Sequence, residues 1–112
     1  MRITFGSKKL EKLANDLKKC QIEMGQKRAK LFFTRLDDLS NAITLDDVRH
    51  LPGNYHELTG NRKGQWACNL DQPYRLIFKP MEDPIPTNES GQYIWLEITG
   101  VEIIEVTNYH GK

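Results

Sequence analysis

The sequence lacks the marks of a membrane protein, of a disulfide-rich secreted domain and of a zinc protein. No apolar run approaches the roughly 20 residues of a membrane helix, and the first residues are too poor in apolar side chains for a secretion signal. There are only two cysteines, Cys20 and Cys68, and they stand far apart, so we expect reduced, buried thiols rather than a disulfide. No Cys and His residues cluster at the spacing of zinc ligands. We therefore expect a cytoplasmic protein without a metal or another cofactor.

Net charge is also nearly absent, but its distribution along the chain is uneven. The 112 residues fit one domain, residues 1–112, with a formal net charge of +1. The first 36 residues hold ten Lys and Arg against three Asp and Glu, a balance of +7 that leaves −6 for the remainder. A basic helical half indicates a polyanion as partner, with Lys8 and Lys12 as candidate contacts. An ordinary solvated, lysine-rich helix surface is the alternative, and charge alone does not decide between them.

The first half of the chain has helical spacing after a short strand. Met1–Phe5 alternates as a strand, and Ser7 can cap the helix that follows. Apolar residues then recur every three or four positions from Leu10 to Cys20. Gly25 breaks this pattern, and a second helix runs to about Ala42. We expect the two helices to form an antiparallel pair.

The second half alternates as strands. Residues 65–70 and 74–79 have the pattern of neighbouring strands, each with one apolar face. Residues 80–91 hold three prolines and predict a long, exposed loop. Residues 93–98 and 101–106 predict a last hairpin. The sum is an α+β domain, in which two N-terminal helices pack on one face of a mostly antiparallel sheet of about four to five strands.

Three basic residues stand where a core does not require them. Arg75 lies in the middle of an otherwise buried strand, and arginine is rarely buried unless it is paired. Its planar fork suits a phosphate; an ion pair with a core carboxylate such as Glu97 is the alternative. Arg62 and Lys63 occupy a turn bounded by glycines, residues 60–64, where the backbone can approach a ligand closely. A solvated hairpin turn is the alternative there.

Proton-transfer chemistry has its best candidate near the end of the sequence. His110 follows the last predicted strand, and imidazole titrates close to neutral pH. Tyr109 is the candidate for stacking on a base. The alternative is that both belong to a frayed tail. His56, in the turn region before residue 60, is a second histidine candidate.

The combination of these residues resembles a known family. The run Pro52-Gly53-Asn54, Leu58, Gly60, Arg62, Gly64-Gln65-Trp66, Tyr74-Arg75-Leu76 and Tyr109-His110 is similar to HigB-like killer toxins. These toxins belong to the RelE superfamily of type II toxin–antitoxin systems, and the resemblance covers about residues 51–110. It implies a RelE-like microbial RNase fold and ribosome-dependent mRNA cleavage without a metal, in which the 2′-hydroxyl attacks the neighbouring phosphate. It also implies a HigA-like helix-turn-helix antitoxin as partner, with operator DNA reached only through that antitoxin.

The resemblance also implies roles for individual residues. Arg75 matches the arginine of the family's active cleft, and Arg62 matches the basic residue of its glycine turn. Tyr109 and His110 match its C-terminal aromatic residue and histidine. These four are the expected catalytic residues. The expected RNA-binding residues are Lys63, Asn108, His56, Lys8 and Lys12.

Two positions depart from the family's pattern. Many relatives have lysine where this chain has Thr59, and aspartate where it has Asn108. Because an amide cannot act as a carboxylate base, proton transfer rests on His110. The alternative function is therefore a catalytically weak or inactive module of the same fold, which binds a helix-turn-helix antitoxin and acts in operator regulation.

Overall fold

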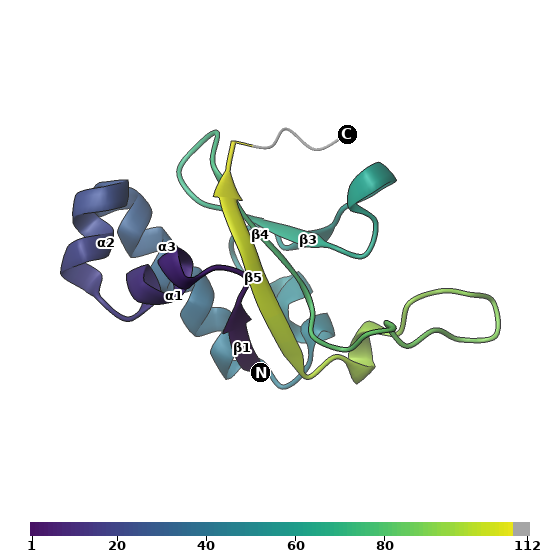
Figure 1. The fold of residues 1–112 in the computed structure, drawn as a ribbon. Helices are drawn as coiled ribbons and strands as arrows, with labels where there is room; N and C mark the ends of the chain where they lie inside the picture. Colours follow the sequence, from purple (N-terminus) through teal and green to yellow (C-terminus); the bar gives the residue numbers. More distant parts are fainter. Residues whose placement is uncertain (109–112) are drawn as a thin grey trace.

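A five-stranded sheet forms the centre of the protein, whose computed structural model describes residues 1–108 (Figure 1). The order of the strands across the sheet is β1-β5-β4-β3-β2. β1 runs parallel to β5, and the other neighbouring pairs are antiparallel. The strands are β1 (Arg2–Phe5), β2 (His56–Glu57), β3 (Trp66–Asn69), β4 (Arg75–Pro80) and β5 (Gly100–Thr107). The sheet confirms the expected mixed, mostly antiparallel architecture.

Three α-helices lie on one side of this sheet in the described part of the chain (Figure 1). They are α1 (Lys8–Ala14), α2 (Leu17–Met24) and α3 (Gln26–Asn41). The expectation of a single first helix was wrong, because α1 ends before Asn15 and α2 begins after Asp16. The Asn15 side chain donates to the Glu11 carbonyl at 2.8 Å, and the Asp16 carboxylate accepts from the Lys19 amide at 3.0 Å, as an N-cap does. No helix within residues 1–108 is long and apolar enough to cross a membrane.

The expected last hairpin is also wrong. Residues 93–98 do not form a strand; instead a short 3-10 helix, η3 (Trp95–Glu97), occupies this segment. The Trp95 ring packs edge-on against Trp66, with centroids 5.3 Å apart and planes at 88°. Ile98 is fully buried three residues further on. Two buried residues three positions apart, Trp95 and Ile98, fit a helical turn rather than the alternation of a strand. The last strand, β5, therefore has no hairpin partner in residues 93–98 and pairs with β4 and β1.

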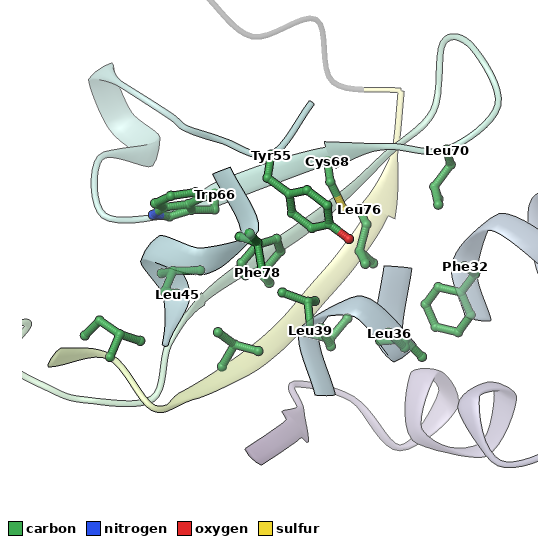
Figure 2. Packing of buried hydrophobic residues seen from close by; sticks show 14 of the residues in the cluster. Phe32, Leu36, Leu39, Leu45, Tyr55, Trp66, Cys68, Leu70, Leu76 and Phe78 are labelled. Atoms are coloured by element: carbon green, nitrogen blue, oxygen red, sulfur yellow. The ribbon is translucent and has the colours of Figure 1, made fainter. Parts of the chain in front are cut away.

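The core fills the space between the helices and the sheet face that they cover (Figure 2). Phe78 of β4 lies at its centre, with ring centroids 6.3 Å from both Tyr55 and Trp66. A 3-10 helix, η1 (Leu45–His50), closes one end of this core with two fully buried side chains. Buried apolar residues from α3, β3 and β4 complete it: Phe32, Leu36, Leu39, Cys68, Leu70 and Leu76.

Both cysteines are buried and unpaired, as expected. Cys20 lies on α2, where its thiol approaches the Met24 sulfur at 3.6 Å. Cys68 lies on β3, and burial raises the pKa of its thiol to about 12. Both thiols are therefore protonated at neutral pH, and they act as packing residues rather than as nucleophiles.

Candidate functional site

The face of the sheet that points away from the helices, here named the outer face, carries few apolar side chains. Its apolar residues form a small cluster of Leu58, Ala67 and Ile77, with Ile104 packed against it. Residues paired across neighbouring strands project to the same face. The register pairs His56 with Ala67, Ala67 with Ile77, and Ile77 with Glu105. The outer face therefore has an apolar floor with polar and charged side chains around it: His56, Arg62, Arg75, Lys79, Glu102 and Glu105.

Arg75 begins β4 on this face. It pairs in register with Thr107, near the end of β5, and its side chain is half-buried. Its guanidinium makes one long contact, 3.5 Å, to the carbonyl oxygen of Tyr74. Within residues 1–108 no carboxylate forms an ion pair with it, and the alternative partner Glu97 is exposed on η3. A half-buried guanidinium in this setting is suited to bind an anion.

The start of β4 is held in place by an ion pair from the helices. The Arg28 guanidinium of α3 binds the Asp71 carboxylate through two hydrogen bonds, 2.9 and 3.1 Å long. The same guanidinium lies 3.5 Å from the centre of the Tyr74 ring. The hydrogen bonds from Arg28 lower the pKa of Asp71 below its ordinary value. The loop before Arg75 is thus tied to α3, which positions the Arg75 backbone.

Arg62 reaches the outer face from a short 3-10 helix, η2 (Gly60–Arg62). Its guanidinium donates to the Gln65 side chain at 2.8 Å and to the Glu105 carboxylate at 3.0 Å. These contacts hold the fork over the sheet and offset part of its charge. Arg62 is therefore a positioned cation, whereas Arg75 carries charge that no described carboxylate offsets.

His56 also lies on the outer face, as the first residue of β2. Its Nδ1 is 2.7 Å from the carbonyl oxygen of Asn54. Because a carbonyl oxygen only accepts, Nδ1 carries a proton, and Nε2 is left as the acceptor in the neutral ring. Proton transfer at this side of the sheet would therefore use Nε2.

The remaining predicted residues are distributed less favourably. Lys63 lies beside the loop of residues 80–94, with its Nζ 5.7 Å from the centre of the Tyr93 ring. Lys8 and Lys12 belong to α1 in the helical layer, not to the outer face. Asn108 is exposed directly after Thr107, the partner of Arg75. Tyr109 and His110 lie outside the described residues.

Glu105 is a residue of this face that the sequence did not single out. A register shift in the pairing of β4 and β5 falls between Ile77 and Phe78 and places Glu105 opposite Ile77. A register shift of one residue moves the side chains that follow it to the other face of the sheet. The position of Glu105 on the outer face therefore follows from this bulge and not from simple alternation along β5. The only signal in the sequence was an acid within an apolar strand. Among residues 1–108, no group of three or more His, Cys, Asp or Glu could hold a metal ion.

Comparison with known proteins supports the architecture. No protein-family model matches the chain, and no curated protein matches it in sequence. Solved structures with a similar fold include the YoeB/ParE toxin from Agrobacterium tumefaciens, with a TM-score of 0.51 and 10% sequence identity. The match covers 98% of this chain and 100% of that one. At such low identity the likeness concerns the fold alone, and the expected RelE-like α+β fold is thereby confirmed.

Proposed function

We propose that the protein is the toxin of a type II toxin–antitoxin system, a HigB-like endoribonuclease of the RelE superfamily that cleaves mRNA on the ribosome. The observation that carries the proposal is Arg75, a half-buried cation on the outer face without a carboxylate partner among residues 1–108. The fold shared with a YoeB/ParE toxin supports it, and so does the resemblance of residues 51–110 to killer toxins.

The chemistry is an internal transfer at phosphorus. The 2′-hydroxyl of one nucleotide attacks the adjacent phosphate and expels the 5′-oxygen of the next, which leaves a cyclic phosphate and a 5′-hydroxyl end. Arg75 binds the phosphate oxygens, on which negative charge builds up in the transition state. Arg62 holds the phosphate backbone beside it. His110 transfers the protons, with Nε2 of His56 as the second candidate.

The other predicted residues bind RNA in this proposal. Tyr109 stacks on a base, and Asn108 donates hydrogen bonds but cannot take up a proton. Lys8 and Lys12 on α1 contact ribosomal RNA, so ribosome binding weakens as salt rises. The protein would act in the cytoplasm, and a HigA-like helix-turn-helix antitoxin would hold it inactive and carry it to operator DNA.

The test is expression in bacteria of the wild-type protein, Arg75→Ala, His110→Ala and a matched control, Arg2→Ala. Arg2 is an exposed arginine paired with Gly100, whereas Arg75 is paired with Thr107 at the other end of β5. These positions are seven residue steps apart along β5, about 23 Å. We expect the wild type and the control to arrest growth and to cleave mRNA in primer extension. Arg75→Ala should cleave about a hundredfold more slowly. Equal growth arrest by all four proteins would show that the site is assigned wrongly.

A non-enzymatic module that binds the antitoxin is the second candidate. Asn108 and Thr59 favour it, because the family's usual carboxylate and lysine are missing there. The pairing of Arg62 with Glu105 favours it too, since that cation is already partly offset. Primer extension on translated mRNA separates the two: no cleavage at any expression level, together with intact antitoxin binding, selects the module.

A further inference from the structure

A second cleft lies at the β2 edge of the sheet, where the long loop of residues 80–94 meets the rest of the fold. This loop extends away from the helices (Figure 1). The cleft between it and the η1, β2 and η2 segments, here named the loop cleft, has a volume of about 510 Å³. Its lining includes Arg49, Lys63, Asn88, Gln92, Tyr93 and Trp95. None of the contacts assigned above to phosphate chemistry uses it.

One wall of the loop cleft is aromatic. Tyr93 is half-buried, and its ring lies 5.1 Å from Trp95, with the planes at 58°. Trp95 in turn packs edge-on against the fully buried Trp66 at 5.3 Å. The Tyr93 ring is therefore backed by the Trp95 indole, which is in turn held by the buried Trp66. A ring held in this way can stack with a flat ligand at little entropic cost.

The other walls provide charge and hydrogen-bonding groups. Lys63 reaches over Tyr93, and the Arg49 guanidinium lies 4.8 Å from the centre of Trp66. Arg49 is held there by Glu57 at 2.9 Å. The Gln92 side chain accepts from Asn88 at 3.0 Å, and its amide nitrogen has no partner within residues 1–108. An aromatic face with a cation above it and amide and carboxylate groups around it matches an unpaired nucleobase.

The loop cleft is built before any ligand arrives. Gly64, with φ +93°, lies so close to the loop that an added Cβ would be 3.2 Å from Cδ1 of Ile85 and 3.9 Å from the Tyr93 hydroxyl. This glycine therefore lets the loop pack onto the basic turn. Inside the loop, the Asn88 side chain accepts from the amides of Ser90 and Gln92 at 2.9 and 3.0 Å. When a pocket is preformed, less of the binding free energy is lost to ordering its side chains and loops.

We propose that the loop cleft binds one unpaired base of an RNA whose backbone lies on the outer face. Adjacent residues connect the two sites, because Arg62 contacts Glu105 on the outer face while Lys63 contacts Tyr93 in the cleft. A backbone that follows these two cations leaves the outer face at the turn and brings one of its bases to Tyr93. The choice of RNA as ligand rests on the proposed function; the shape and chemistry of the cleft do not.

Binding is measured with fluorescein-labelled single-stranded RNA in which every 2′-oxygen is methylated, so that it cannot be cleaved. A second set of the same oligonucleotides carries one abasic position, moved along the strand. The proteins are the wild type, Tyr93→Leu, Tyr93→Phe and, as control, Leu96→Ala, whose side chain is 64% exposed and lies outside the cleft. Thermal unfolding of each variant checks that it is folded.

We expect wild type, Tyr93→Phe and Leu96→Ala to lose about tenfold in affinity when one particular position is abasic. Tyr93→Leu should bind the intact strand about tenfold more weakly and lose nothing further at that position. A Tyr93→Leu protein that still discriminates the abasic strand as the wild type does would overturn the inference, and so would a wild type indifferent to every abasic position. A wild type that shows the expected discrimination but cleaves no mRNA refutes the proposed nuclease and leaves the base site standing.

Discussion

The two faces of the sheet use the same strands for different purposes. On the inner face, β3 and β4 contribute Trp66, Cys68, Leu76 and Phe78, all fully buried. On the outer face, the intervening positions contribute one buried apolar residue each, Ala67 and Ile77, and end in polar side chains. Adjacent residues of one strand thus belong either to the core or to the candidate site.

This division separates stability from chemistry. The inner face buries large aromatic and aliphatic side chains, and such burial supplies most of the favourable free energy of folding. The outer face holds charged side chains of both signs, which contribute little to the core. Variants on the inner face should therefore lose stability, and variants on the outer face should lose activity.

The largest effect on stability is expected from Phe78→Ala. This removes a fully buried ring in contact with Tyr55 and Trp66 and leaves a cavity, which should cost about 4 kcal/mol of the free energy of unfolding. Urea denaturation followed by circular dichroism measures it. The next residue, Lys79, is exposed on the outer face, and Lys79→Ala should change stability by less than about 0.5 kcal/mol. Similar losses for both would mean that the two faces are not energetically distinct.

Arg75→Ala should show the reverse pattern. Among residues 1–108 its side chain makes one long hydrogen bond, so we expect its free energy of unfolding to stay within about 0.5 kcal/mol of wild type. If the proposed function is right, cleavage falls about a hundredfold, equivalent to about 2.7 kcal/mol of transition-state stabilisation. Urea denaturation and primer extension on the same variant give both values. A large loss of stability would instead make Arg75 a structural residue.

Gly53→Ala should disturb the contact between α3 and the end of β3. At φ +116° an added Cβ would lie 2.8 Å from the Arg35 guanidinium, which donates to the Asn69 carbonyl at 2.8 Å. We expect a loss of about 2 kcal/mol in the free energy of unfolding. Gly60 also has a positive φ, +64°, but has nothing within 4 Å of an added Cβ. Gly60→Ala is therefore the matched control, and an equal loss in both would assign the effect to backbone strain alone.

The smallest expected effect concerns acid stability. Arg28 lowers the pKa of Asp71 in the folded protein, so the unfolded chain binds more protons in the acidic range. The stabilisation is present above the pKa of the unfolded carboxyl, about 4, and is lost as pH falls through the lower, folded value. Asp71→Asn should cost about 1 kcal/mol at neutral pH and flatten this acid dependence. Denaturation between neutral and acidic pH measures it, with the exposed Asp37→Asn as control.

The fold class was predictable because its signals are local and repeated. Apolar spacing indicated helices, and alternation placed Leu76 and Phe78 on one face and Ile77 on the other, as the structure has them. The helix break was missed because the apolar spacing continues through Asn15 and Asp16. Asp16 as an N-cap was the signal that marks it. The parallel pairing of β1 with β5 joins distant segments, and no local pattern encodes it.

The candidate site was predictable only in part. Arg75, Arg62 and His56 reach the outer face, although their roles stay predictions. Lys63 is instead found beside the Tyr93 ring of the loop of residues 80–94, because the side chains of adjacent residues in a tight turn point in different directions. Glu105 was missed, since its position depends on a register shift that a sequence pattern cannot reveal.

The place of β5 in the sheet has a consequence for how the protein is made. β5 lies between β1 and β4, so the first strand has no neighbour in the sheet until the last strand is synthesised. Loop closure across nearly the whole described chain must therefore precede completion of the sheet. On an emerging polypeptide, Arg75 is exposed long before the strand that ends beside it arrives. The surroundings of Arg75 are therefore complete only when β5 has joined the sheet.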